Sequence, residues 1–411
     1  MVVRARAVLL FSGKMLTAFY LLILLQIGMG LYSLWQGVLW LQMTRRRLAQ
    51  PTGFFTPRVA LFCPVKGMEP GLDENLAALT ELDYRDYEIF FAISSVDDPA
   101  YRLLEHVAAS SKHPVHIVRA GRAKDCGDKV NNLRAAVEQA GDKFDLFVFA
   151  DSDGRPSRRW LARLVAPLSD PTLGAVTTFR WLIPLRGGFW SALASAWNAS
   201  IATYLGEHNN NFCWGGGTAI LRRRFEEVRV ADAWRGSVSD DYSLTTAVQT
   251  AGYKIEFVPE CLVPSLGDVD ARAFFEFTTR QLIITRVYSP KLWRIAALGH
   301  GFYCAAVLLG IGSWIAGLLT GAPVMQFLTL TLLLLGLAAI RGTLRLAAVM
   351  DLLPEWRDTL LAYAWAWTLL APIVPFVYLY NSAVAAFTRR IRWRGIRYEL
   401  VSARDTRLIA G

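Results

Sequence analysis

LFVFADSD, residues 146–153, is the stretch that decides the fold class of this chain. Its first five residues are apolar, which indicates a buried strand, and its charges begin where that strand would end. Asp151 and Asp153 stand one residue apart at this exit, so both carboxylates can reach a single hard cation. A divalent ion held there would clamp a diphosphate. Asp-x-Asp occurs in many loops by chance, and its position after an apolar strand is what favours a metal site.

The sequence on the N-terminal side of this stretch alternates between short apolar runs and amphipathic segments. Three more apolar runs predict strands, at residues 59–63, 88–93 and 115–118. Apolar residues at helical spacing lie between the strands, at residues 75–82, 100–110 and 130–139. This alternation predicts an α/β domain with a parallel, doubly wound sheet, in which ligands bind at the carboxyl ends of the strands.

Charged residues follow the other predicted strands as well. Lys66 comes after the first strand, and Asp97 and Asp98 come after the second, where a carboxylate can accept hydrogen bonds from a nucleobase or ribose. Asp98 followed by proline is also typical of a helix N-terminus, and both interpretations can hold. Lys129 begins the helix before the 146–153 stretch, where it can contact phosphate or sugar or simply be solvated. The absence of G-x-G-x-x-G and Walker sequences argues against a dinucleotide or ATP site.

A third acidic group, Asp240 and Asp241, opens a predicted helix over residues 242–250. A carboxylate that faces the cleft can act as the general base that deprotonates an acceptor hydroxyl. The alternative is a helix N-cap without a chemical role. Upstream, Trp214 precedes three glycines that include Gly216, and such glycines permit close approach by a sugar or a lipid headgroup. A plain flexible loop is the other interpretation of that segment.

The apolar residues, 54% of the chain, collect in blocks at its two ends. The first block covers residues 7–42, and about 20 residues suffice for one membrane-spanning helix. Its length and the basic residues 44–47 that follow favour an anchor over a signal peptide. Three further candidate spans lie at residues 295–319, 324–350 and 360–387. The pattern predicts an integral membrane protein whose charged middle folds as a separate domain.

Charge supports a membrane partner and argues against nucleic acid. The net charge is +10, but the basic residues concentrate beside the apolar blocks, as the positive-inside rule and anionic lipid headgroups would require. Arg341 and Arg345 would be costly against lipid, so their helix is expected to pack inward or to lie partly at the surface. Three spans after a cytoplasmic domain would put the basic residues 389–397 on the wrong side. Either one C-terminal segment is interfacial or re-entrant, with Pro372 and Pro375 marking the last block, or the number of spans differs by one.

The five cysteines lie far apart and form no Cys-x-x-Cys pair. This spacing suggests neither a zinc site nor a disulfide framework and fits a reducing cytoplasmic face.

The order of these parts resembles the ceramide glucosyltransferase family, a branch related to the family 2 glycosyltransferases. The resemblance covers nearly the whole chain and rests on the order and spacing of motifs that are individually short. It implies a GT-A (Rossmann-like) fold, an inverting transfer from UDP-glucose or a similar donor, and a Mg or Mn ion. Carried over, it implies that Asp98 or Asp97 contacts uridine, that Asp151 and Asp153 hold the metal and diphosphate, and that Asp241 is the catalytic base.

One signature of that family is altered here. The family carries Gln/Arg-x-x-Arg-Trp near the end of its catalytic domain, whereas residues 280–288 of this chain read RQLIITRVY. An arginine there would neutralise the leaving diphosphate, and a tryptophan would pack against the acceptor. Arg280, with Arg286 and Tyr288, are the candidates to substitute. The change argues against processive polysaccharide synthases. A lipid acceptor is still favoured, since a base near the membrane surface would meet a hydroxyl of a lipid headgroup.

Together these observations predict four units: an N-terminal membrane helix (1–43), a cytoplasmic catalytic domain (44–290), C-terminal transmembrane or interfacial helices (291–388) and a basic tail (389–411). The membrane is a bacterial inner membrane or a Golgi membrane. An amphipathic segment, residues 269–293, is expected to lie along the bilayer and shape the acceptor entrance.

The predicted reaction is transfer of a sugar from a nucleotide-sugar donor to a membrane lipid such as ceramide, a diacylglycerol or a hopanoid. A polyprenyl phosphate or polysaccharide acceptor is the alternative, and a non-catalytic membrane scaffold is the third possibility. Donor-binding residues are expected to be Lys66, Asp97, Asp98, Lys129, Asp151 and Arg280. Acceptor-binding residues are expected to be Trp214, Gly216 and Asp240.

Overall fold

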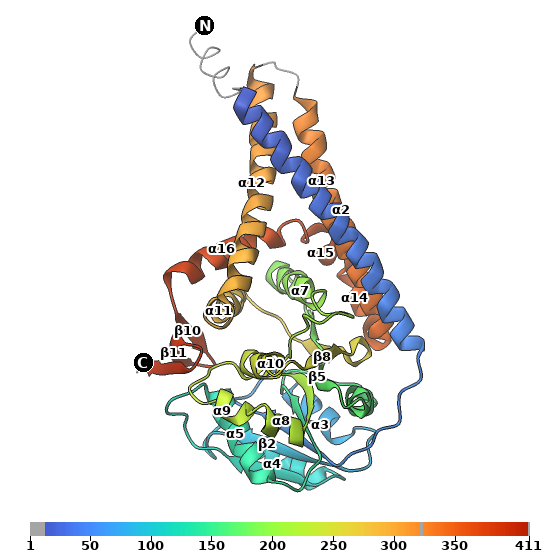
Figure 1. Ribbon diagram of the computed structural model, residues 1–411, viewed down its shortest axis with the longest axis vertical. Helices are drawn as coiled ribbons and strands as arrows, with labels where there is room; N and C mark the ends of the chain where they lie inside the picture. Colours follow the sequence, from blue (N-terminus) through green and yellow to red (C-terminus); the bar gives the residue numbers. More distant parts are fainter. Residues whose placement is uncertain (1–12, 321–323, 410–411) are drawn as a thin grey trace.

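The computed structural model describes residues 13–320 and 324–409. Three long helices rise from a body built around a β-sheet, and the C-terminal segments lie between the two (Figure 1). Residues 7–12 of the predicted first apolar block lie outside the described residues. The rest of that block belongs to helix α2 (Gly13–Ala49), which leans along the side of the molecule (Figure 1).

The central sheet has seven strands in the order β3-β2-β1-β4-β7-β5-β8. These strands are β1 (Val59–Pro64), β2 (Tyr87–Ile93), β3 (Val115–Arg119), β4 (Leu146–Ala150), β5 (Leu173–Thr177), β7 (Gly217–Leu221) and β8 (Lys254–Phe257). All four predicted strands are confirmed and pair in parallel. The prediction of a wholly parallel sheet is wrong at β7, which runs antiparallel to both β4 and β5. Its first residue pairs with the last residue of β4, so the chain enters β7 at the edge where β4 ends.

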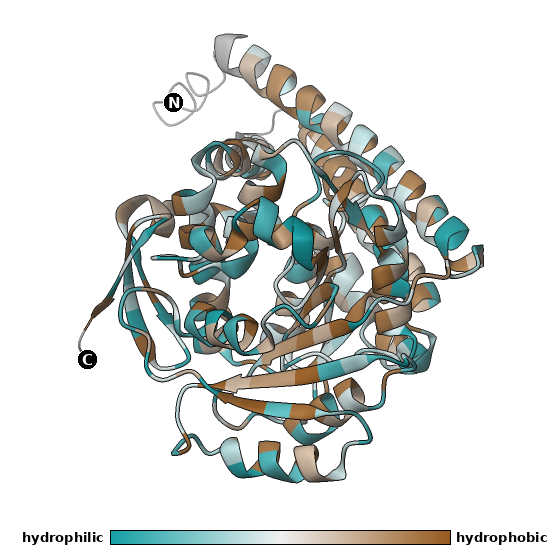
Figure 2. Ribbon diagram, turned by 60° about the horizontal axis from the view of Figure 1, so that its bottom comes forward, coloured by the Kyte–Doolittle hydropathy of each residue, from teal (hydrophilic) through white to brown (hydrophobic). Residues whose placement is uncertain are grey.

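Both faces of the sheet are buried, which explains why its strands are almost continuously apolar (Figure 2). Along β4, Phe147 and Phe149 belong to one buried cluster and Val148 to the other, as the alternation of side chains in a strand requires. The helices that follow the strands are α3 (Leu72–Thr80), α4 (Tyr101–Ser110), α5 (Asp128–Ala140), α6 (Trp160–Val165), α8 (Arg222–Glu227), α9 (Val230–Ala233) and α10 (Asp240–Thr250). The three helices predicted between the strands correspond to α3, α4 and α5.

A layer of helices separates the sheet from the three long helices (Figure 1). It contains α7 (Phe189–Ala202) and α11 (Ala271–Tyr288), together with the parallel pair β6 (Arg180–Ile183) and β9 (Val263–Leu266). The amphipathic segment predicted at residues 269–293 corresponds largely to α11. Trp367 donates a 3.1 Å hydrogen bond to Ser195 of α7, so this layer is tied to the C-terminal helices.

Three helices of the described residues are long and apolar enough to cross a membrane: α2, α12 (Pro290–Thr320) and α13 (Met325–Leu352). The fourth predicted span, residues 360–387, is not one helix. It is divided into α14 (Arg357–Ala362), α15 (Ala364–Leu369) and α16 (Val374–Phe387), with Pro372 in the break before α16. Since proline cannot donate a backbone hydrogen bond, it interrupts the helix. The pair α12 and α13 brings the chain back toward the body, which fits an interfacial C-terminal segment.

The last residues do more than provide charge. The stretch predicted as a basic tail forms a three-stranded antiparallel sheet of β10 (Arg390–Trp393), β11 (Ile396–Ser402) and β12 (Asp405–Ile409). The turn between the first two strands consists of Arg394 and Gly395, both with positive φ angles of 50° and 80°. Such a turn matches the twist of a hairpin. The sheet packs against α11.

Candidate active site

One cavity of about 1740 Å³ connects the carboxyl ends of the central strands with the long helices. At the sheet end it is lined by charged residues, which include Lys66, Lys129, Asp151, Asp153, Asp240 and Asp241. At the other end it is lined by residues of α2, α12, α13 and α16, which include Ser33, Tyr303, Arg341, Arg345 and Tyr378. A charged region at the sheet edge and a region of apolar helices therefore share one cavity.

Lys129 joins two of the acidic groups that the sequence singled out. It lies in the first turn of α5, and its Nζ atom is 2.7 Å from Asp151 Oδ1 and 3.2 Å from Asp240 Oδ1. Burial by itself lowers the pKa of Lys129, but the two carboxylates outweigh burial and raise it. Burial raises the pKa of Asp151, and the charge of Lys129 more than reverses this, so that this pKa is lowered. Burial raises the pKa of Asp240 to about 6.

Asp153 has the properties of a metal ligand. Its Oδ2 atom is 3.1 Å from Arg180 Nη1, whereas its Oδ1 atom is buried and has no hydrogen-bond partner among the described residues. Burial raises its pKa, which an adjacent cation would reverse. No group of three metal-binding side chains occurs in residues 13–320 and 324–409. Two carboxylates nevertheless fit Mg²⁺ or Mn²⁺, since such ions often take their other ligands from substrate phosphates and water.

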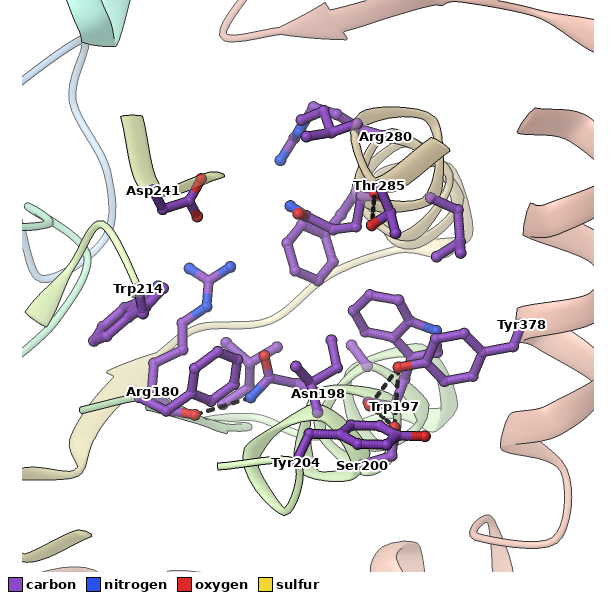
Figure 3. A pocket seen from close by; sticks show the side chains of 18 of the residues that line it. Arg180, Trp197, Asn198, Ser200, Tyr204, Trp214, Asp241, Arg280, Thr285 and Tyr378 are labelled. Atoms are coloured by element: carbon purple, nitrogen blue, oxygen red, sulfur yellow. Dashed lines mark hydrogen bonds between the residues drawn. The ribbon is translucent and has the colours of Figure 1, made fainter. Parts of the chain in front are cut away.

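The glycine loop lies directly against these carboxylates. A Cβ atom on Gly215 would come within 2.2 Å of Asp240 Oδ2 and 2.7 Å of Lys129 Nζ. On Gly216 it would come within 2.6 Å of Asp151 Oδ2. These glycines are therefore required for close packing. Trp214 lines the cavity (Figure 3), but Gly216 does not, so of this pair only the tryptophan is placed to touch a ligand.

Asp241 lies at the start of α10 and lines the cavity, where it borders the same opening as Arg180 and Arg280 (Figure 3). The N-cap of this helix is Ser239, whose hydroxyl accepts a 3.3 Å hydrogen bond from the backbone N–H of Tyr242. Asp241 accepts a 2.7 Å hydrogen bond from the same N–H and another from the Ser239 hydroxyl. Ser239 is therefore the N-cap of α10. Both hydrogen bonds to Asp241 end on its Oδ1 atom, and the Asp241 side chain still lines the cavity.

The residues after the second strand lie apart from this cluster. Asp98 accepts hydrogen bonds of 2.9 Å from the backbone N–H of Gly67 and 3.0 Å from that of Ala100. Asp97 is exposed and contacts Ser95, and neither aspartate lines the cavity. The geometry of Asp98 is that of a loop and helix-start residue, which was the alternative interpretation.

Lys66 does line the cavity and forms a 2.9 Å ion pair with Asp128. Of the charged residues predicted after the first two strands, Lys66 lines the cavity and Asp97 and Asp98 do not.

The altered signature on α11 divides between two sides of the helix. Arg280 lines the cavity, donates a 3.3 Å hydrogen bond to the carbonyl of Arg392 and lies 5.3 Å from the centre of the Trp393 ring. Burial lowers its pKa to about 10. Arg286 is turned away and donates a 2.5 Å hydrogen bond to the carbonyl of Ala385. Of the two arginines, only Arg280 is placed to reach a ligand.

Tyr288, at the end of α11, holds the loop that leads into the acidic pair. Its hydroxyl accepts a 2.8 Å hydrogen bond from the backbone N–H of Val238 and lies 2.8 Å from the Ser237 hydroxyl. Tyr242 and Thr285 form a second link between α10 and α11, with hydroxyl oxygens 2.8 Å apart. The α11 stretch therefore orients the start of α10.

Two residues of the C-terminal hairpin, Trp393 and Arg394, also line the cavity, and the sequence analysis missed them. Arg394 forms an ion pair with Glu69 and lies near Asp153. Tyr398 anchors the hairpin, since its hydroxyl accepts a 3.2 Å hydrogen bond from the backbone N–H of Asp128. Arg394-Gly395, between two segments of alternating residues, is a pattern that could have indicated a hairpin. The charge of residues 389–397 was instead attributed to the membrane surface.

Comparison with known proteins gives a family and a set of solved structures. The family model described as glycosyl transferase family 21 matches residues 18–405. A mannosyltransferase from Pyrobaculum calidifontis, solved with GDP-Man and Mn²⁺, is 18% identical, with 81% of this chain and 99% of that chain covered and a TM-score of 0.46.

Two further structures cover 56% of this chain each. GalNAc-T7, solved with UDP, GalNAc and Mn²⁺, is 13% identical over 49% of its own chain, with a TM-score of 0.38. Glucosyl-3-phosphoglycerate synthase from Mycobacterium tuberculosis is 16% identical over 80% of its own chain, with a TM-score of 0.37.

Proposed function

This chain belongs to glycosyl transferase family 21, and we propose that it is an inverting enzyme that transfers a sugar from a UDP-sugar to a membrane lipid. Its mixed α/β sheet resembles the GT-A fold that the sequence predicted. UDP-glucose is the first candidate donor and ceramide the first candidate acceptor. The observation that supports a lipid acceptor best is the single cavity that joins the acidic edge of the sheet to the long apolar helices.

Asp241 is the proposed catalytic base. It takes the proton of the acceptor hydroxyl while that oxygen forms a bond to the anomeric carbon and the bond to the diphosphate breaks. A single displacement of this kind inverts the configuration at the anomeric carbon. Asp241 suits this role because it lines the cavity and forms no ion pair among the described residues, whereas the adjacent Asp240 is held by Lys129.

Cationic side chains surround the place where the leaving group would gather charge. Asp151 and Asp153 would hold a divalent ion, which when bound supplies charge stabilisation to the diphosphate. Arg280 and Arg394 approach the same region from α11 and the C-terminal hairpin and would offset the remaining charge. Trp393 and Arg394 would thus provide, from a distant segment, the tryptophan and arginine that are absent from the altered signature on α11.

The sheet end would receive the donor, and α11 would guide the acceptor. Lys66 and Lys129 line the sheet end, next to the expected position of the diphosphate. Trp214 is the proposed aromatic contact for the sugar or acceptor. The basic residues Arg45, Arg46 and Arg47 at the end of α2 support a cytoplasmic catalytic domain, because such residues flank the cytoplasmic ends of membrane helices.

The proposal is tested by incubating the full chain, in vesicles, with a panel of UDP-sugars and either ceramide or diacylglycerol, with and without Mn²⁺. The expected result is a metal-dependent glycolipid of inverted anomeric configuration. Replacement of Asp241 by Asn should reduce the rate by a factor of about 10²–10⁴, the usual contribution of a general base. UDP binding by the Asp241→Asn variant provides the control for folding.

Other outcomes point to other functions. A polymer, or a product that forms only with a polyprenyl phosphate, would replace the proposed acceptor. Retention of full activity by Asp241→Asn would remove this residue from the role of base. Failure to turn over any UDP-sugar, by protein that binds UDP, would contradict the enzyme assignment itself.

A further inference from the structure

Two arginines on α13 lie in the part of the cavity that the proposed reaction does not use. Arg341 and Arg345 are one helical turn apart, and both line the cavity. The Nε atom of each is buried without a hydrogen-bond partner in the described chain. Arg341 donates a hydrogen bond to the Ser33 hydroxyl. Arg345 is 8% exposed and has neither a hydrogen bond nor an ion pair with any residue of 13–320 or 324–409.

The surroundings of these arginines supply hydroxyl groups. Tyr204, Tyr303 and Tyr378 line the same cavity as the two arginines. None of the carboxylates in the described residues forms an ion pair with either guanidinium. A buried guanidinium without an anion is costly, because its charge has lost the stabilisation that water gives. This cost is what an anionic ligand would remove.

The height of the two arginines along the membrane helices indicates where that anion resides. Helix α2 runs beside α13, with Gly37 next to Arg341 and Leu344, and with Arg45 ion-paired to Asp351. The large exposed apolar side chains of α2 end at Leu39. Arg341 and Arg345 therefore lie level with the transition from apolar to basic residues, which is where lipid headgroups meet a membrane helix.

We propose that Arg341 and Arg345 bind the phosphate of an anionic membrane lipid whose headgroup enters the cavity from the α13 side. A planar guanidinium presents paired N–H donors that match phosphate oxygens, and two of them one turn apart can share one phosphate. Tyr204 lines the same cavity, whereas the Tyr378 hydroxyl is already engaged with the Ser200 hydroxyl and the carbonyl of Trp197. This site is separate from the diphosphate site at the sheet edge, which lies next to Asp151 and Asp153.

The same cavity gives this lipid a connection to the proposed chemistry. Tyr242, which directly follows Asp241, lines the same cavity as Arg341 and Arg345. A lipid phosphate held by the arginines would therefore share one cavity with the proposed base. The phosphate belongs either to the acceptor itself or to a second lipid bound beside it. Only this last step, from binding to acceptor choice, rests on the proposed function.

The binding site is tested without any donor. Full-length protein in neutral detergent is titrated with dioleoyl phosphatidic acid and with dioleoylglycerol, which differ only in the phosphate, and bound lipid is measured by native mass spectrometry. Wild-type protein should prefer phosphatidic acid by about tenfold or more, equivalent to about 1.4 kcal/mol. Arg345→Gln should abolish this preference and leave dioleoylglycerol binding unchanged. Arg345→Lys, which keeps the charge but loses the planar donor pair, should retain part of it.

The matched control is Arg357→Gln, which removes an exposed cation at the start of α14. It should leave the preference intact. Equal binding of the two lipids by wild-type protein would overturn the proposal without reference to any variant. A loss of preference in Arg357→Gln as large as in Arg345→Gln would also overturn it, because general surface attraction would then explain the binding.

A transfer assay distinguishes the two sources of the phosphate. Phosphatidic acid has no alcohol hydroxyl and cannot accept the sugar itself. If the bound phosphate belongs to the acceptor, phosphatidic acid should compete with the acceptor and inhibit transfer. If the phosphate belongs to a second lipid, phosphatidic acid should leave transfer to ceramide uninhibited. Absence of transfer to every acceptor, together with a preference that Arg345→Gln abolishes, would refute the proposed function and leave the lipid site standing.

Discussion

Cationic side chains form ion pairs on one side of the cavity and lack them on the other. At the sheet edge the cations are paired, since Lys66 contacts Asp128, Arg180 contacts Asp153 and Lys129 lies between two carboxylates. On the side of the long helices, Arg280 and Arg345 form no ion pair within the described part of the chain. Paired charges are compensated before any ligand binds, whereas an anion that binds beside an unpaired buried cation offsets the cost of burying it.

The difference suggests a division of work. In the proposed function, the sheet edge would position a metal and a diphosphate with little rearrangement, because its side chains already have partners. The opposite wall would recognise what enters, because its arginines Arg280, Arg341 and Arg345 form no ion pair with a carboxylate of the described residues. Loss of a cationic side chain should therefore lower stability more at the sheet edge than on the opposite wall.

Removal of the divalent ion should have the largest effect. A metal that neutralises a leaving diphosphate contributes several kcal/mol, so chelation should lower the transfer rate about a thousandfold. Asp153→Asn should behave similarly and require more Mn²⁺ for the remaining activity. Asp142→Asn, at an exposed position, should leave the Mn²⁺ dependence unchanged. Full activity in the presence of chelator would remove the metal from the account.

Replacement of Lys129 by Met should test whether the sheet edge is held together by its ion pairs. It leaves two buried carboxylates without their cation, which should reduce the free energy of unfolding by about 3–5 kcal/mol. Thermal unfolding in detergent, with exposed Lys143→Met as the control, measures this loss. An unchanged melting temperature would show that the paired cluster does not stabilise the fold.

Replacement of Arg280 by Gln should leave stability nearly unchanged and reduce kcat. Hydrogen bonds to charged groups contribute about 1.5–3 kcal/mol, which corresponds to a loss of about 10–100-fold. Arg286→Gln is the matched control on the same helix, because that side chain contacts a backbone carbonyl outside the cavity. Equal losses in the two variants would contradict the assignment of Arg280 to the leaving group.

Tyr288→Phe should have the smallest effect. It removes the hydroxyl that holds Val238, so the start of α10 should loosen and the free energy of unfolding should fall by about 1 kcal/mol. Tyr380→Phe, at an exposed position on α16, is the control. A change in kcat larger than that of Arg280→Gln would place Tyr288 in the chemistry itself.

Sequence was a good guide to the sheet edge and a poor guide to the opposite wall. Asp151, Asp153, Asp241 and Lys129 could be identified because each directly follows an apolar strand or begins a helix. Strand ends converge in an α/β sheet, so local pattern there predicts proximity. For Asp98 the local pattern also predicted a helix start, and its carboxylate accepts hydrogen bonds from neighbouring backbone N–H groups.

The rest depended on which distant segments meet. The direction of β7 follows from its pairing with β4, which no local pattern encodes. Trp393 and Arg394 reach the cavity because the C-terminal sheet packs on α11, more than a hundred residues earlier in the chain. Arg341 and Arg345 were recognised as costly in lipid, but their missing ion pairs became evident only from the packing around them.

The measurement that tests this account most directly is photo-crosslinking of a ceramide analogue with a diazirine near its hydroxyl to the full chain in vesicles. Labelled peptides should include residues that line the cavity, among them Tyr242, Thr285 and Tyr378, and unlabelled ceramide should compete with the labelling. Labels confined to the outer, lipid-facing surfaces of α2, α12 and α13, with no competition, would show that the lipid does not enter the cavity and would contradict the account.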